Sequence, residues 1–305
     1  GFVQTSPVKK ITGSVLDGWQ AGGRFVDGEL ALNMPLKIES NESIKVDTSL
    51  QLLESSVSMG SIGLDLQSVN GRIAYSSERN LYANEITATL WRQPVSIEMG
   101  RRNLGAEITD VTASTNVSMN RVMDWLELPL GEFIAGKTAV DLQLSLGGDQ
   151  PSLSIDSMLN GVSIDMPKPL RKKAGSSRAF SLVWQLEEIE QPMMLHVSES
   201  ASMLLGFKDY QFDAAVISLG AVDKPTELPK VLLAELSDKT LYANNVITVT
   251  GVVDHFDLDD WQPLISLSSS DSASTIAGEV DSVNWRGKNI GIGYTEIWGQ
   301  QFRQS

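Results

Sequence analysis

The stretch Leu159–Leu186, LNGVSIDMPKPLRKKAGSSRAFSLVWQL, decides the fold class. Apolar and polar residues alternate over 162–166 and again over 180–187, which is typical of strands with one wet face. Pro167 and Pro169 separate the two runs, because a proline cannot donate a ladder hydrogen bond. The turn between them carries the densest positive charge of the chain, at Lys168, Arg171, Lys172, Lys173 and Arg178. Two apolar sheet faces beside a basic turn predict a surface that holds an apolar ligand.

The same period-two alternation dominates the rest of the sequence. The positions expected to form the apolar face are Ile62, Leu64, Leu66, Val140, Leu142, Leu144, Leu146, Val162, Ile164, Phe180, Leu182, Trp184, Leu186 and Phe212. Glycine-rich turn clusters separate the runs, and buried parallel strands would lose the alternation, so the pattern favours an antiparallel sheet. At about 12 residues per strand and turn, strands stacked in one row give a mostly-β, elongated sheet.

Two short helices are expected to interrupt the strands. One lies near 119–127, with Ser118 as its N-cap, and the other lies near 258–264 after Asp257. Each helix contains an Asp-Trp pair, and the tetrapeptide Leu-Tyr-Ala-Asn occurs at both 81–84 and 241–244. These pairs predict two similar β layers, residues 1–150 and residues 151–305, each with one of the helices.

Three segments carry a family resemblance. They are Met166–Lys172 with its Pro-x-Pro-Leu-x-Lys pattern, Gly251–Asp254 leading into Leu258–Trp261, and Ser282–Lys288 with the sequence SVNWRGK. Together they resemble the YhdP branch of the AsmA-like proteins, and the similarity runs from about Ile62 to Ile297. One departure is Arg171, where the family turn usually has a small residue, so the turn is more basic here.

The resemblance implies a fold and a function. The sheet is expected to curve lengthwise into a groove of the β-taco type that shields phospholipid acyl chains in passive transit between the inner and outer membranes of a Gram-negative envelope. Relatives are longer and begin with a membrane anchor, so the chain is expected to be a periplasmic piece of an inner-membrane-anchored parent. Its partners would then be phospholipids, the two membranes through the parent, and other segments of that parent.

Composition excludes several other classes. The 305 residues carry a formal net charge of −14, which disfavours nucleic acid as a partner, because phosphates demand a basic surface. The chain has no cysteine, so disulfides, thiolate metal sites and thiol catalysis are excluded. No run of about 20 apolar residues is present in the sequence to span a bilayer.

Catalytic interpretations find little support. The two histidines are too few for a histidine-rich metal centre, and His196 is expected on a solvated strand face. No nucleophile elbow, P-loop or dinucleotide fingerprint is present. The carboxylates at 254, 257, 259 and 260 fit no EF-hand loop, and helix capping explains most of them. We therefore expect no enzyme, no cofactor and no metal, with a hydrolase using this cluster as the weakest alternative.

Two questions stay open at the level of sequence. The basic turn could attract anionic headgroups at the lip of a groove, or it could be an ordinary solvated turn, which is the more common outcome. Alternation also cannot distinguish an open groove from a sheet closed by a second sheet. The alternative function is therefore a structural or adhesive β-repeat protein of the cell envelope that carries no lipid.

Overall fold

The computed structural model describes the chain in separate stretches. The described residues are 19–33, 45–60, 63–102, 108–126, 128, 130–147, 151–186, 193–208, 211–220, 247–257, 260–261, 274–285, 288–290, 294–298 and 301–303. Within them, the strands are β1 (Trp19–Asn33), β2 (Lys45–Met59), β3 (Leu64–Ser76), β4 (Asn80–Leu90), β5 (Gln93–Arg101), β6 (Thr109–Ser118), β7 (Ile134–Leu146), β8 (Ser152–Ser157), β9 (Val162–Ile164), β10 (Phe180–Gln185), β11 (Met193–Val197), β12 (Ala201–Lys208), β13 (Gln211–Leu219), β14 (Ile247–Asp257), β15 (Ser274–Trp285), β16 (Lys288–Ile290), β17 (Tyr294–Trp298) and β18 (Gln301–Arg303).

The strands confirm the predicted fold class. They form an open sheet that does not close into a barrel, and antiparallel ladders run from β1 through β6. Two pairs differ from the expectation, because β13–β14 and β14–β15 are parallel. A parallel pair needs a long crossover connection, and residues 221–246 and 258–273 provide that length.

One helix has described bounds, α3 (Met119–Trp125), and it confirms the first predicted helix. Met119 and Met123 form its buried side, as their spacing of four residues predicts. Ser118 is at the N-cap position with an extended backbone, but its side chain makes no capping hydrogen bond. The second predicted helix lies outside the described residues except for Asp260 and Trp261, which have helical backbone.

The chain forms two compact units whose division does not follow chain order. Unit 1 comprises Gly1–Asn116, Val140–Ile155 and Gln185–Glu187. Unit 2 comprises Val117–Ala139, Asp156–Trp184 and Glu188–Ser305. The predicted layers 1–150 and 151–305 stay a prediction.

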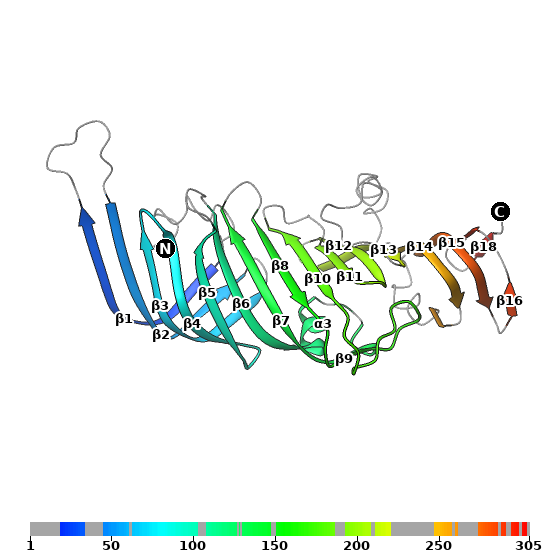
Figure 1. Ribbon diagram of the computed structural model, residues 1–305, viewed down its shortest axis with the longest axis horizontal. Coiled ribbons are helices and arrows are strands. Elements are labelled where there is room, and N and C mark those ends of the chain that lie inside the picture. Colours follow the sequence, from blue (N-terminus) through cyan, green and yellow to red (C-terminus); the bar gives the residue numbers. More distant parts are fainter. Residues whose placement is uncertain are drawn as a thin grey trace, which may run out of the picture. The chain divides into compact units, whose positions relative to one another are not determined.

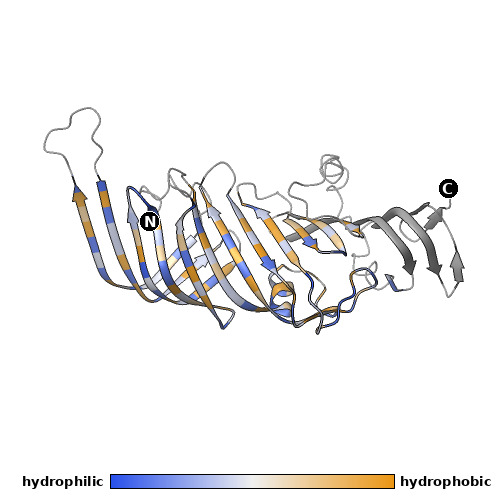
Figure 2. Ribbon diagram, in the orientation of Figure 1, coloured by the Kyte–Doolittle hydropathy of each residue, from blue (hydrophilic) through white to orange (hydrophobic). Residues whose placement is uncertain are grey.

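Unit 1 has one apolar and one polar face. In β4, Ile86 and Ala88 are buried while Thr87 between them is exposed, so alternate side chains face opposite sides. Ile86 lies opposite Ile97 and Ala88 opposite Val95 in the β4–β5 ladder, and opposite residues share a face. Hydropathy alternates along these strands in Figure 2, where orange and blue residues follow one another.

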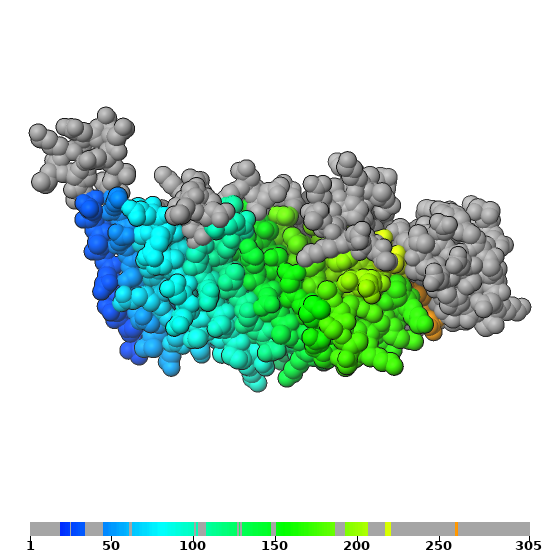
Figure 3. All heavy atoms as spheres, viewed as in Figure 1, coloured from blue at the N-terminus to red at the C-terminus, as the bar shows by residue number. Residues whose placement is uncertain are grey.

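Register extends this apolar face to the first strand. Successive pairings connect Ala83 with Met99, Leu81 with Tyr75, Ile73 with Leu50, and the β1 residues Leu30 and Leu32 with Thr48 and Val46. We call this face of unit 1 the interior face. Its apolar members include Leu30, Leu32, Leu50, Leu52, Ile73, Ala83, Ile86, Ala88, Leu90, Val95, Ile97, Val140, Leu142 and Leu144. In Figure 3 the atoms of β1 to β6 follow one another as a continuous surface in chain order.

Strands β1 to β4 are bent rather than straight, as Figure 1 shows. Register shifts interrupt each of the ladders β1–β2, β2–β3, β3–β4 and β4–β5 near mid-strand. Positive φ angles occur at the same level, at Gly23 (111°), Glu54 (47°), Ser68 (49°) and Gly71 (142°). Bulges bend a strand and raise its twist, so bulges aligned across neighbouring strands bend the sheet along a line. We call this line, marked by those four residues, the crease.

Unit 2 has its own core. Val162, Met193, Ala201 and Leu204 are almost completely buried. The strands β10, β11, β12 and β13 pair antiparallel in chain order, and β9 pairs with the first part of β7. Burial does not alternate on β12, where the neighbours Leu204 and Leu205 are both buried, so this strand is covered on both sides there.

Candidate functional site

Exposure of the interior face changes with distance from the crease. Next to the crease, Val69 and Ile86 are 2% and 3% exposed, because the unit's own side chains cover them. Away from the crease in β1, Leu30 and Leu32 are 68% and 54% exposed. Leu50 in β2 is only half-buried, and Gly28 opposite it has no side chain that could cover it further. The interior face is thus packed at the crease and open to a ligand near β1.

The sequence-predicted positions in unit 1 lie on or beside this face. The buried ones are Leu64, Val140, Leu144 and Leu146, and the half-buried ones are Leu66, Leu142 and Leu186. Ser114 donates a hydrogen bond to Asp141 on the opposite side of β6 and β7, which leaves Val140 and Leu142 facing the interior. Ile62 lies outside the described residues.

The remaining predicted positions belong to unit 2. Val162 and Leu182 are buried in its core, and Ile164, Phe180 and Trp184 are half-buried. Phe212 is on β13, but its side chain lies outside what is described. The structure therefore brings the predicted set together within two units rather than along one demonstrated surface.

Leu30 and Leu32 are not among the positions predicted from the sequence. The signal was present, because Glu29, Ala31 and Asn33 flank them in period two. The bulge between Phe25 and Asp27 breaks the pattern just before them and shortens the run to a few residues. A strand with a mid-strand bulge is hard to recognise from periodicity alone.

A cleft of about 860 Å³ lies across β1 to β4, and its lining includes Leu30 and Ala83 of the interior face together with residues of the polar face. Its lining includes Gln51, Arg72 and Ala74, which point away from the interior residues Leu50 and Ile73. Arg72 makes long ion pairs with Asp27 and Glu29 across this face. The charged side chains mark the polar-face part of this cleft as a poor environment for hydrocarbon.

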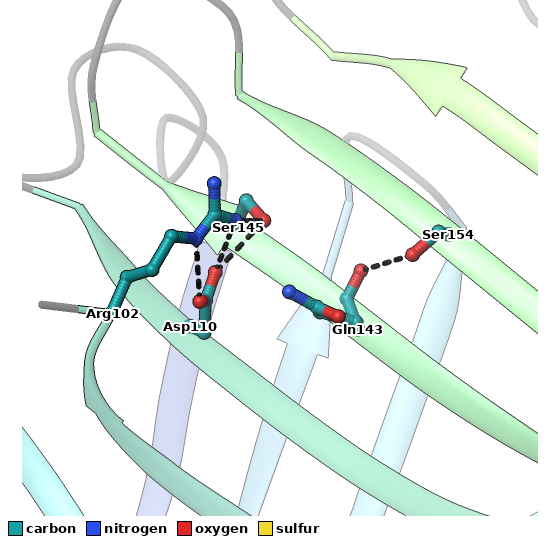
Figure 4. A network of polar contacts seen from close by, with 5 residues as sticks. All are labelled: Arg102, Asp110, Gln143, Ser145 and Ser154. Carbon is teal, nitrogen blue, oxygen red and sulfur yellow. Dashed lines mark hydrogen bonds and ion pairs between the residues drawn. The ribbon is translucent and has the colours of Figure 1, made fainter. Parts of the chain in front are cut away.

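A polar clip joins the ends of β5, β6 and β7 in unit 1 (Figure 4). Arg102 donates from Nε and Nη2 to the two carboxylate oxygens of Asp110, at 2.8 and 2.6 Å. Ser145 accepts from Arg102 Nη2 at 2.6 Å and donates to Asp110 at 2.9 Å. The Arg102 hydrogen bonds, with a smaller contribution from Ser145, hold the pKa of Asp110 below its usual range. Three strands are thereby tied at one point.

Asp110→Asn is expected to lower the free energy of unfolding by about 1–2 kcal/mol. The expected loss is at the lower end for a charge-assisted contact, because the Arg102 side chain is 39% exposed and solvent screens it. Urea unfolding at neutral pH measures it, and Asp65→Asn, at an exposed carboxylate of β3, is the matched control.

The difference in unfolding free energy between the unaltered protein and Asp110→Asn is also expected to depend on pH. The folded-state pKa of Asp110 is lowered from 3.8, so its stabilisation is complete above that pH and is lost as the pH falls through the folded-state value. The stability gap between the protein and Asp110→Asn should therefore narrow on acidification below pH 4. An unchanged gap down to pH 3 would show that the carboxylate charge contributes nothing.

The basic turn of unit 2 satisfies most of its own charges. Lys172 is 3% exposed, and its ammonium donates to the carbonyl oxygens of Val162 and Lys173 at 2.9 and 3.2 Å. Arg178 donates to the carbonyls of residues 169, 170 and 171, and Arg171 donates to that of Met166. Lys168 and Lys173 have exposed side chains. The structure thus gives Lys172, Arg171 and Arg178 a role in holding the turn.

Burial, and then the charge of Arg178, lowers the pKa of Lys172 from 10.5. The charged form is therefore disfavoured in the folded state, and stability from this group rises as the pH increases from the folded-state pKa to 10.5. We expect the protein to gain stability relative to Lys172→Met between pH 8 and pH 10, measured by urea unfolding. Lys173→Met, at an exposed neighbour, should show no such change, and parallel curves for Lys172→Met would contradict the assignment.

His196 corrects one expectation. It is buried rather than solvated, and its Nδ1 lies 3.0 Å from the hydroxyl of Ser202, its opposite residue on β12. Two polar side chains can face the core because they pair with each other. Among the described residues no group of three potential metal ligands occurs, and of the predicted acidic cluster only Asp260 is described.

An open sheet with a polar exterior and an apolar, partly exposed interior face defines a scaffold that presents hydrocarbon-compatible surface. The sequence matches the YhdP protein family over residues 1–305, and the chain belongs to that family. The predicted resemblance is thereby confirmed. No curated protein and no solved structure matches the chain.

Family membership indicates a lipid-transport-related protein of the cell envelope, and the family is of a transport or bridge type rather than an enzymatic one. In the part of the chain that the structure describes, no helix has the length and apolar character needed to cross a membrane.

Proposed function

We propose that this chain is a periplasmic segment that shields phospholipid acyl chains on an apolar β-groove, for passive transport between the inner and outer membranes. The observation that carries the proposal is the exposure of Leu30 and Leu32 on a face whose residues are mostly apolar. Neighbouring exposed apolar residues on a mostly apolar face are typical of a binding surface. Family membership supports the same class of ligand.

The energetics favour a passive mechanism. Exposure of each CH₂ group to water costs about 0.8 kcal/mol, so an acyl chain of about 18 carbons faces a penalty on the order of 14 kcal/mol. An apolar face removes this penalty at every position along it, and the chain can slide without a large barrier. No bond is made or broken, so the proposal requires no enzyme activity and no cofactor.

Differences in exposure within unit 1 support one position for the proposed acyl chain. Packing at Val69 and Ile86 leaves no access beside the crease, whereas Leu30, Leu32, Leu50 and Ile73 are exposed or half-buried. We call these four residues the acyl lane. We assign the acyl chain to this lane, and the predicted residues Leu66 and Leu142 extend the accessible apolar surface on other strands.

Only the exposed lysines of the basic turn support the proposal. Lys168 and Lys173 have exposed side chains that can attract anionic headgroups over a distance of about 10 Å at moderate salt. Lys172 cannot do so directly, because its ammonium is buried against carbonyl oxygens. The remaining partners proposed are the two membranes through the parent chain and other segments of that parent.

Native mass spectrometry of the protein purified from a bacterial envelope without detergent, together with lipid analysis of a solvent extract, tests the proposal. We expect phospholipid retained in a stoichiometric amount. A lipid-free mass with a cooperative unfolding transition would overturn transport and favour the closed structural protein. The observation that favours this second function is the burial of Val69, Ile86 and Leu52 next to the crease, where the protein covers its own apolar face.

A further inference from the structure

The crease removes backbone groups from the β ladder. Glu54 in β2 and Ser68 in β3 have positive φ, at 47° and 49°, so their peptide groups turn out of the usual pairing direction. The β2–β3 register shifts on both sides of Ser55, between Leu52 and Val57. A polar backbone group that loses its partner costs free energy unless another group satisfies it.

Asn70 satisfies both of these displaced groups with one side chain. Its Oδ1 accepts a hydrogen bond from the Glu54 N–H at 2.9 Å, and its Nδ2 donates to the Ser68 carbonyl at 2.8 Å. The Asn carboxamide offers an acceptor and a neutral donor on two separate atoms of one short side chain, so it can reach both groups at once. It thereby ties β2 to β3 at the bend, on the polar face, opposite the exposed Thr87.

Without the carboxamide, the displaced groups have an alternative. Glu54 and Ser68 are not glycines, so an extended backbone is easier for them than positive φ. Return to that conformation restores ladder partners and removes the bulges, which straightens β2 and β3. Leu50 lies four residues before Glu54 and Ile73 five residues after Ser68, so the acyl lane moves when the bend changes.

We propose that Asn70 is a positioning residue of the acyl lane: its carboxamide fixes the bend of β2 and β3 and so holds Leu50 and Ile73 where they line the lane beside Leu30. The inference rests on the proposed function for its ligand, an acyl chain. Its geometry rests only on the crease, so the positioning role of Asn70 and the proposed function can fail separately.

The test compares Asn70→Ala and Asn70→Asp with the control Gln67→Ala. The control changes an exposed side chain of the same strand, and the Gln67 carbonyl oxygen can still accept the hydrogen bond from the Thr89 hydroxyl. Hydrogen exchange of the Glu54 amide reports its hydrogen bond to Asn70. The amount of phospholipid retained per protein, measured by native mass spectrometry, reports the state of the acyl lane. In Asn70→Ala we expect amide exchange at least tenfold faster and retained phospholipid at least fivefold lower. Gln67→Ala should match the unaltered protein in both.

Asn70→Asp keeps the acceptor for Glu54 and loses the donor to Ser68, so its effects should be intermediate, and it is the variant to interpret if Asn70→Ala does not fold. Faster exchange with unchanged lipid in either folded variant would overturn the positioning role. An unaltered protein that retains no lipid would overturn the proposed function instead. The exchange data would still report the hydrogen bond between Asn70 and the Glu54 amide.

Discussion

The double substitution Leu30→Asp, Leu32→Asp is expected to remove retained phospholipid, at least tenfold, while the protein stays folded. Both side chains are more than half exposed, so their replacement changes stability by only about 0.5 kcal/mol each. A carboxylate that must lie against hydrocarbon, however, costs several kcal/mol unless it is protonated or paired. The lane would then repel the ligand that it is proposed to hold. Native mass spectrometry measures the loss, and circular dichroism with urea unfolding confirms the fold.

Ala31→Asp is the matched control for that experiment. Ala31 is exposed, lies between the two leucines and points to the polar face, so it adds a charge to the same strand without touching the lane. Its lipid content should equal that of the unaltered protein. Leu144→Asp is less informative, because Leu144 is 9% exposed and a buried carboxylate would unfold the unit. Equal lipid loss in Ala31→Asp and in the double variant would contradict the lane.

Alternation predicted the fold class because it depends on short-range geometry. Val140, Leu142 and Leu144 alternate with Asp141 and Gln143, and each follows its expected face in β7. Side chains point to opposite faces every residue, so the sequence alone specifies which positions meet the apolar side. The helix at Met119–Trp125 could also be predicted from the sequence, since the spacing of its apolar residues is a local pattern.

The crease was not predictable in the same way. Glu54 and Ser68 carry no local signal for positive φ, because non-glycine residues rarely adopt it and neither occurs in a turn motif. Their conformation depends on Asn70, which is 16 residues from Glu54 in the chain and meets it only after β2 and β3 have paired. Tertiary contacts also decided His196 and Lys172, which period and charge had placed at the surface. Each is buried because a partner for its polar atoms comes from the fold.

Gly71→Ala should be among the most destabilising single changes in unit 1, by about 2–4 kcal/mol. Gly71 has φ of 142°, which an L side chain rarely adopts. A Cβ there would lie 2.6 Å from the carbonyl oxygen of Glu85 and 3.0 Å from the Cα of Ile86. Both are backbone atoms of β4, so relief requires movement of a strand rather than of a flexible side chain. The free energy of urea unfolding measures the effect.

Gly100→Ala provides the comparison, because a Cβ at Gly100 meets nothing within 4 Å and the residue is also in a strand of unit 1. That variant should be neutral or stabilised by up to about 1 kcal/mol, since alanine restricts the unfolded chain. Comparable losses at both positions would show that the close approach of β3 to β4 does not limit stability. A loss confined to Gly71 would mean that the crease requires glycine where β4 passes closest, just as it requires the Asn70 carboxamide where β2 leaves the ladder. The bend would then be specified by two adjacent residues of β3, Asn70 toward β2 and Gly71 toward β4, and the position of the acyl lane would follow from that bend.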